Sequence, residues 1–186
     1  LDMSRNAVMS VDGLKKYLFL LKKMGYNCVM LYTEDTYEVN NEPYFGYMRG
    51  RYTKEELQRI DDYAFDYGVE VIPCLECYGH MEKYLIWPEA AAIKDTGSVL
   101  LAREEKTFEF LDDLLRTTSS IFRSKRVHIG MDEAHSLGLG RYLDLHGFTN
   151  RFEILSRHLN RVSEMVKGYG LEPMIWSDMF FRLQLE

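Results

Sequence analysis

Apolar residues recur along the chain with two spacings, one typical of helices and one typical of short buried strands, and the two alternate. Leu14, Leu18 and Leu21 repeat at helical spacing within 10–24, and the run "NCVMLY" at 27–32 follows directly. A spacing of three or four residues predicts an amphipathic helix, whereas a short continuous apolar run indicates a buried strand. This stretch therefore predicts one helix followed by one strand.

The same alternation continues to the end of the chain. Thr53 with Glu56, and Asn150 with Glu153, have the spacing of a capping box and mark two helix starts. The predicted helices span 10–24, 53–68, 104–122 and 150–170. The predicted strands span 1–5, 27–32, 69–75, 126–131 and 172–176. Strict alternation of strands and helices predicts an α/β fold with a parallel sheet.

Loop lengths favour a barrel over an open doubly wound sheet. The connections after the strands at 27–32, 69–75 and 126–131 are far longer than ordinary strand-to-helix loops. Long loops at the carboxyl ends of strands build the active face of a (β/α)8 TIM barrel, and no G-x-G-x-x-G follows the early strands. A whole barrel needs about 250 residues. We therefore expect the first five βα units of a barrel, in one domain covering 1–186, with an open sheet edge that favours self-association.

Charge and hydropathy narrow the classes of partner. The chain has 23 basic and 29 acidic residues, a net charge of −6, and no basic block. Binding to nucleic acid is therefore not expected, because phosphate backbones attract basic surfaces. No apolar run approaches the roughly 20 residues of a membrane helix. We expect no membrane partner.

The three cysteines, Cys28, Cys74 and Cys77, lie in or beside apolar runs. Cys74 and Cys77 form a C-x-x-C, which is also found in redox and zinc sites, but there is no second pair. We interpret all three as reduced core thiols, and this interpretation predicts a cytoplasmic protein.

Polar residues gather where each predicted strand ends. They are Arg5, Glu34, Asp35, Glu76, His80, Asp132, Glu133, His135, Trp176 and Asp178. In a barrel the carboxyl ends of all strands meet at one mouth, so these side chains would lie together although they are far apart in sequence. The sequence thus predicts a site at that mouth.

Asp132 and Glu133 are adjacent acids at the end of a buried strand, where their repulsion costs stability. Neighbouring carboxyls push their pKa values apart, and glycoside hydrolysis needs one acid that is protonated and one that is ionised. Carboxylates at a barrel mouth also bind divalent metals, so a metal-dependent sugar isomerase or lyase with Glu76, Asp132 and Asp178 as ligands is an alternative. A non-catalytic sugar-binding fragment is a third hypothesis.

Five motifs resemble a known family. "HIGMDE" is similar to the H-x-G-x-D-E signature of the family 20 glycoside hydrolases, the β-N-acetylhexosaminidases, and "IPCLECYGH" resembles their P-E-x-D-x-P-G-H segment. "LDMSR", "LYTED" and "PMIWSDMF" resemble the first, second and fifth strand segments, in family order. Glu34, Glu76 and Tyr78 depart from the usual residues and resemble the hexosaminidase-D-like branch.

The resemblance implies removal of terminal β-linked N-acetylglucosamine or N-acetylgalactosamine by a substrate-assisted retaining mechanism. Glu133 would be the general acid and base, and Asp132 would orient the 2-acetamido group whose oxygen attacks the anomeric carbon. His80 would bridge Glu34 and Glu133 and tune the acid.

The resemblance also implies substrate-binding roles for Arg5, Trp176 and Asp178. Arg5 would grip sugar hydroxyls and Trp176 would line the acetamido pocket. No metal and no cofactor is required, and the partner is a carbohydrate with a terminal N-acetylhexosamine. Further pocket residues of the family come from later strands, so we expect the 186-residue chain by itself to be weakly active or inactive.

Overall fold

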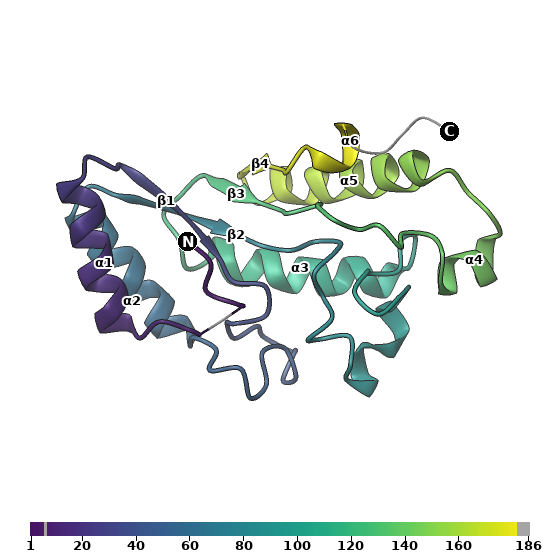
Figure 1. Ribbon diagram of the computed structural model, residues 1–186, viewed down its shortest axis with the longest axis horizontal. Coiled ribbons are helices and arrows are strands. Elements are labelled where there is room, and N and C mark those ends of the chain that lie inside the picture. The colour runs from purple at the N-terminus through teal and green to yellow at the C-terminus, as the bar shows by residue number, and fades with distance from the viewer. Residues whose placement is uncertain (6, 182–186) are drawn as a thin grey trace.

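The computed structural model describes residues 1–5 and 7–181 as helices packed along a parallel sheet (Figure 1). The strands are β1 (Cys28–Tyr32), β2 (Glu70–Cys74), β3 (Arg126–His128) and β4 (Glu172–Met174). The helices are α1 (Val11–Lys23), α2 (Lys54–Asp66), α3 (Glu105–Ser119), α4 (Arg141–His146), α5 (Arg151–Gly168) and α6 (Asp178–Phe181), with a 3-10 helix, η1 (Pro88–Ile93).

The four strands form one sheet in the order β1-β2-β3-β4, and all neighbours are parallel. In Figure 1, α1 and α2 lie side by side at one end of the molecule and α5 lies at the other, beside β4. Sequential order with helical connections is the arrangement of a barrel wall. The α/β prediction and the barrel-type topology are thus confirmed.

The opening segment at 1–5 is shorter as a strand than we predicted. Asp2 forms an isolated parallel bridge with Tyr32, in which Met3 N donates to Tyr32 O at 2.8 Å and Tyr32 N donates to Leu1 O at 3.0 Å. The segment therefore runs alongside β1 without becoming a regular strand. The segment predicted as the first of five strands therefore lies beside β1 as expected, but the described residues contain only four regular strands.

The helices begin where the capping residues indicate. Ser10, Thr53 and Asn150 are N-caps whose side chains accept backbone N–H bonds, and Thr53 forms the predicted reciprocal capping box with Glu56. These bonds satisfy amides that have no partner within the helix. The predicted starts of α1, α2 and α5 are confirmed.

The strand predicted at 126–131 ends early, at His128. Gly130 and Met131 both have positive φ, 69° and 76°, which an extended strand does not permit. Likewise, the strand predicted at 172–176 ends at Met174. The residues that follow each strand become loops that carry polar side chains. The long loops also contain η1, α4 and α6, which the apolar pattern did not predict.

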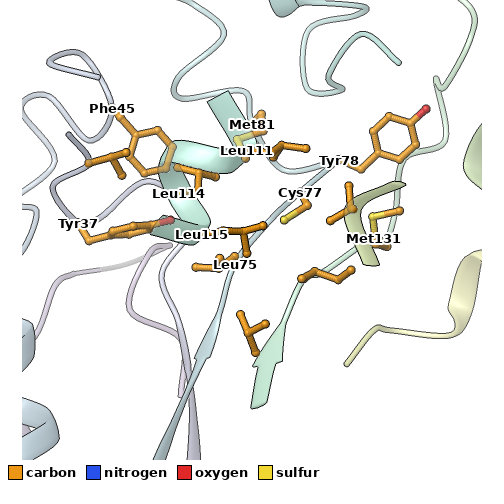
Figure 2. Packing of buried hydrophobic residues seen from close by; sticks show 14 of the residues in the cluster. Tyr37, Phe45, Leu75, Cys77, Tyr78, Met81, Leu111, Leu114, Leu115 and Met131 are labelled. Carbon is orange, nitrogen blue, oxygen red and sulfur yellow. The ribbon is translucent and has the colours of Figure 1, made fainter. Parts of the chain in front are cut away.

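The core decides which way the polar residues after β2 point. Figure 2 shows Leu75 and Cys77 packed among Leu111 and Leu115 of α3, on the helix-covered face. Because successive side chains of an extended segment alternate between faces, Glu76 lies on the opposite face. That face would be the interior of the barrel.

The three cysteines are free thiols, with Cys74 and Cys77 buried and Cys28 exposed. Burial raises the pKa of the Cys74 thiol to about 12. The interpretation as core thiols is therefore confirmed for Cys74 and Cys77 and wrong for Cys28, which lies at the exposed start of β1. Across residues 1–5 and 7–181, the helices include none with the length and apolarity needed to span a bilayer.

Candidate active site

The loops that follow β2 and β3 bring His80 against the two acids of "HIGMDE". His80 Nε2 lies 3.3 Å from Asp132 Oδ2 and 3.5 Å from Glu133 Oε2. The loops are held together at their base, where Leu75 N donates to His128 O at 2.7 Å and Cys77 N donates to Ile129 O at 3.2 Å. Extension of the parallel ladder beyond the strands thus places one histidine between two carboxyls.

The two acids differ in exposure. The side chain of Asp132 is 17% exposed and that of Glu133 is 54% exposed. Glu133 N donates to Asp178 Oδ2 at 3.4 Å, so Asp178 contacts the backbone that carries the exposed acid. Asp132 therefore belongs to the wall of the mouth, while the Glu133 side chain is accessible to solvent.

Glu34 lies in the same mouth but has other partners. Tyr32 Oη donates to Glu34 Oε1 at 3.0 Å, and Arg5 Nε lies 3.7 Å from the same oxygen. The ion pairs of His80 among the described residues are with Asp132 and Glu133. Glu34 and His80 therefore interact through their charges, while Tyr32 and the arginines make the direct contacts to the Glu34 carboxylate.

Arg49 is a residue of this network that the sequence did not single out. Its Nε lies 3.1 Å from Asp35 Oδ1, its Nη2 lies 3.8 Å from Glu34 Oε2, and Nη2 also donates to Ser4 O at 2.9 Å. Arg49 comes from the loop between β1 and α2, where no motif or periodicity marks it. Only the path of that loop brings its guanidinium to the mouth.

Trp176 covers the other side of the mouth. Its ring lies 4.3 Å from that of His128, centroid to centroid, and its N donates to Gly130 O at 3.1 Å. His128 Nδ1 accepts a bond from Gly130 N at 3.1 Å. Burial lowers the pKa of His128, so its imidazole is neutral at pH 7. Trp176 is 38% exposed and offers an apolar wall to a ligand.

Backbone strain concentrates at this mouth. Glu34, His80, Met131 and Glu133 all have positive φ, at 43°, 55°, 76° and 46°. Such conformations cost side-chain-bearing residues about 1–3 kcal/mol each and cluster at functional sites. The strain supports a functional role for this end of the sheet.

The electrostatics of the mouth separate the acids. Contact with Asp132 raises the pKa of His80 above its usual value of 6.5. Burial alone would raise the pKa of Asp132, but the contact with His80 holds it below 3.8. Burial raises the pKa of Glu34. Asp132 is therefore ionised at neutral pH and favours a cationic His80.

A fourth carboxyl, Glu76, lies nearby and is fully buried. Burial raises its pKa well above the usual value, and the charges of Asp132 and Glu34 raise it further. Within the mouth, Glu34 and Glu76 have pKa shifts opposite to that of Asp132. In the sequence analysis, Glu76 has a chemical role only as a ligand of the alternative metal site.

That alternative site is not assembled in the part of the chain the structure describes. No group of three or more His, Cys, Asp or Glu side chains there has the geometry to hold a metal ion. Glu76, Asp132 and Asp178 therefore do not form the ligand set that the isomerase or lyase hypothesis requires.

Comparison with known proteins gives a consistent result. Residues 14–185 match the family described as "Glycosyl hydrolase family 20, catalytic domain". Hexosaminidase D of Homo sapiens is 27% identical over 190 residues, which cover 94% of this chain and 38% of that protein. A β-hexosaminidase of Vibrio furnissii is 26% identical over 147 residues, covering 69% of this chain and 24% of the relative. The chain thus spans well under half the length of these relatives.

Solved structures show the same fold. A family 20 β-N-acetylhexosaminidase of Streptomyces coelicolor A3(2) superposes with a TM-score of 0.77 at 24% identity, covering 96% of this chain and 38% of that one. A mutant β-hexosaminidase of Streptomyces plicatus in complex with its product, GlcNAc, superposes with a TM-score of 0.81 at 23% identity, covering 100% and 39%. The described sheet and helices correspond to part of the TIM barrel of these enzymes.

Proposed function

Because the chain belongs to glycoside hydrolase family 20, as the match over residues 14–185 establishes, we propose that it carries the acid pair of a β-N-acetylhexosaminidase. The substrate is a carbohydrate that ends in a β-linked N-acetylhexosamine. The relative from Streptomyces plicatus was solved with GlcNAc as product, which supports this class of sugar.

In the first step, the carbonyl oxygen of the substrate's 2-acetamido group attacks the anomeric carbon, and the bond to the leaving oxygen breaks. Glu133 donates its proton to that oxygen. The exposure of its side chain, 54%, leaves it free to reach a bound sugar. Asp132 is ionised and held in the wall of the mouth. Its carboxylate accepts a hydrogen bond from the acetamide N–H and stabilises the cationic oxazolinium intermediate.

In the second step, Glu133 takes a proton from water, the water oxygen attacks the anomeric carbon, and the bond to the acetamide oxygen breaks. Two displacements at one carbon retain its configuration. His80, between the two acids, stabilises the carboxylate that Glu133 becomes after it has donated its proton. Arg5 binds sugar hydroxyls, and Trp176 forms the wall of the acetamido pocket. Glu34 holds Arg5, and Asp178 holds the backbone of Glu133.

The observation that carries the proposal is the position of His80, 3.3 Å from Asp132 and 3.5 Å from Glu133. This contact joins two loops of the barrel mouth and holds one histidine against both neighbouring acids. Stabilisation by a charged acceptor and general acid catalysis are the two contributions that the reaction requires.

The test is hydrolysis of nitrophenyl N-acetyl-β-glucosaminide and the corresponding galactosaminide by the native gene product, with the 186-residue chain assayed beside it. We expect turnover that a chelator leaves unchanged and that a thiazoline analogue of the oxazolinium blocks. Glu133→Gln should lower kcat by about 10²–10⁴-fold, because it removes the proton donor.

The matched control is Glu172→Gln, an exposed glutamate at the amino end of β4, which should leave turnover unchanged. Activity that is abolished by a chelator and insensitive to the thiazoline would overturn the proposal. Binding of N-acetylglucosamine without any turnover would instead indicate a sugar-binding protein.

Two further expectations concern the surroundings of the protein. Three free thiols support a reducing compartment such as the cytoplasm. Among the described residues, β4 pairs with β3 along one edge only, and an open edge favours self-association. Light scattering of the 186-residue chain at rising concentration should show an increasing mean mass; a constant monomer mass would contradict this expectation.

A further inference from the structure

The carboxyl of Glu76 has no conventional partner. Glu76 is 0% exposed, and within the described residues neither of its oxygens accepts a hydrogen bond. No ion pair joins it to a cation there either, although Arg5 and Arg49 bind the nearby Glu34. A buried carboxylate without a donor or a cation costs several kcal/mol, so the charged form is strongly disfavoured.

A second orphaned oxygen belongs to Asp132, whose carboxyl lies within hydrogen-bonding reach of the Glu76 carboxyl. Asp132 Oδ2 faces His80, but its Oδ1 is buried and has no donor among the described residues. Two carboxylates cannot hydrogen-bond to each other, because both only accept. A protonated carboxyl carries one O–H donor, so a single proton between Glu76 and Asp132 would satisfy both groups.

Gly130 makes room for this arrangement. A Cβ added at Gly130 would lie 2.3 Å from Glu76 Oε2 and 2.6 Å from its Cδ, closer than side chains ever approach. The carboxyl of Glu76 therefore rests directly on the backbone of Gly130, two residues before Asp132. With φ of 69°, Gly130 also turns the chain so that Asp132 comes back toward β2.

We propose that Glu76 is a positioning residue that keeps a proton and donates it in a hydrogen bond to Asp132. Asp132 is then held on both sides, by Glu76 at Oδ1 and by His80 at Oδ2. It stays ionised and fixed in orientation, as an acceptor of an acetamide N–H must be. Only this catalytic consequence rests on the proposed function; the proton itself does not.

The pKa directions agree with the geometry. Burial, together with the negative charges of Asp132 and Glu34, raises the pKa of Glu76, while contact with His80 lowers that of Asp132. Titratable and charged groups reach Glu76 from every neighbouring segment. They are Arg5, Tyr32, Glu34, Cys74, Cys77 and Asp132. Of these, only Arg5 carries a positive charge, and it pairs with Asp2 and Glu34.

The first test is infrared spectroscopy of the chain at neutral pH. We expect a carbonyl stretch of a protonated carboxylic acid that disappears in Glu76→Gln. The matched control is Glu70→Gln, at the other end of β2, where Arg126 lowers the pKa of the glutamate. That variant should keep the band. Loss of the band in the control, or its absence from the wild type, would overturn the inference.

The second test is the pH dependence of unfolding. Above the usual glutamate pKa of 4.5, the unfolded chain releases a proton that the folded chain keeps, so the folded state loses stability as pH rises. Relative to Glu76→Gln, the unfolding constant of the wild type should rise about tenfold per pH unit until Glu76 ionises in the folded state. Equal pH slopes in the two proteins would contradict a retained proton.

The third test separates positioning from structure in the native gene product. Glu76→Gln keeps a donor toward Asp132 and should preserve kcat. Glu76→Met removes the donor and should lower kcat, and the fold-change in kcat should exceed the fold-change in KM by a factor of about 10–100. Equal kcat losses would overturn the positioning role. If no hydrolysis occurs at all, the proposed function fails, but the infrared band and the pH slope still test the proton on Glu76. If the band is absent while hydrolysis persists, only the inference about Glu76 fails.

Discussion

The two ends of β2 carry glutamates in opposite situations. At the amino end, Glu70 pairs with Arg126 and accepts a hydrogen bond from Ser124 at 2.7 Å, and the contact with Arg126 lowers its pKa. At the carboxyl end, Glu76 has no such partner, faces other acids, and has a raised pKa. The same residue type thus supports the fold at one end of the strand and strains it at the other.

The same difference extends to the segments around each end. Near the amino ends of the strands, Arg123 pairs with both Asp61 and Asp62. At the carboxyl ends, Asp132, Glu133 and Glu34 share two arginines and one histidine. Charges that are matched in pairs stabilise a barrel, whereas unmatched charges in a mouth are available to a substrate. The carboxyl end, where the acids outnumber the cations that pair with them, is therefore the one that can perform chemistry.

The largest effect we expect is on activity, from Asp132→Asn in the native gene product. Removal of a charge aimed at the developing oxazolinium should lower kcat for the nitrophenyl substrate by about 10²–10³-fold. Asp62→Asn, at the paired end, should change kcat little. Similar losses in both variants would mean that the two ends do not differ in function.

The next effect is on stability, in two glycines with the same backbone conformation. Gly130 and Gly68 both have φ of 69°, but a Cβ at Gly68 would meet nothing within 4 Å. Gly68→Ala should cost roughly 1–2 kcal/mol, the price of the left-handed conformation alone. Gly130→Ala should cost about 2–5 kcal/mol, because the Cβ also collides with Glu76.

The free energy of unfolding of both glycine variants, measured by urea denaturation, gives this comparison directly. Equal losses would show that the space above Gly130 can relax and that Glu76 is not confined there.

A smaller effect is expected from His80→Gln. The pKa of His80 is raised in the folded state, so its protonated form stabilises the fold fully below pH 6.5, and this contribution is lost as pH rises through the folded value. We expect a loss of about 1 kcal/mol below pH 6.5 that shrinks at higher pH. Glu70→Gln should show no such change in this window, because Glu70 is ionised throughout.

The smallest effect is expected from Arg126→Gln, which removes the partner of Glu70. The side chains of this pair are 40% and 34% exposed, and exposed ion pairs contribute about 0–1 kcal/mol. Thermal unfolding should therefore shift by a few degrees at most. A larger loss would show that the amino end depends on this pair more than its exposure suggests.

The local pattern of the chain was enough to predict most of the regular structure. Capping residues such as Thr53 and Asn150 bond to amides two or three residues away, so their spacing alone locates the helix starts. Apolar runs likewise locate the strands to within a few residues. The end of β3 was predicted too late, because the backbone conformation at Gly130 and Met131 is not marked by hydrophobicity.

The sequence by itself determined which residues stand at the ends of the strands, because the order of strands and helices in a barrel follows the order of the chain. Only the tertiary structure decided which of them meet. His80 contacts Asp132 and Glu133, Glu34 instead binds Tyr32, Arg5 and Arg49, and Glu76 lies buried against Gly130. These contacts join segments far apart in the sequence, so they depend on loop paths and on which face each side chain occupies, and neither is encoded in residue spacing.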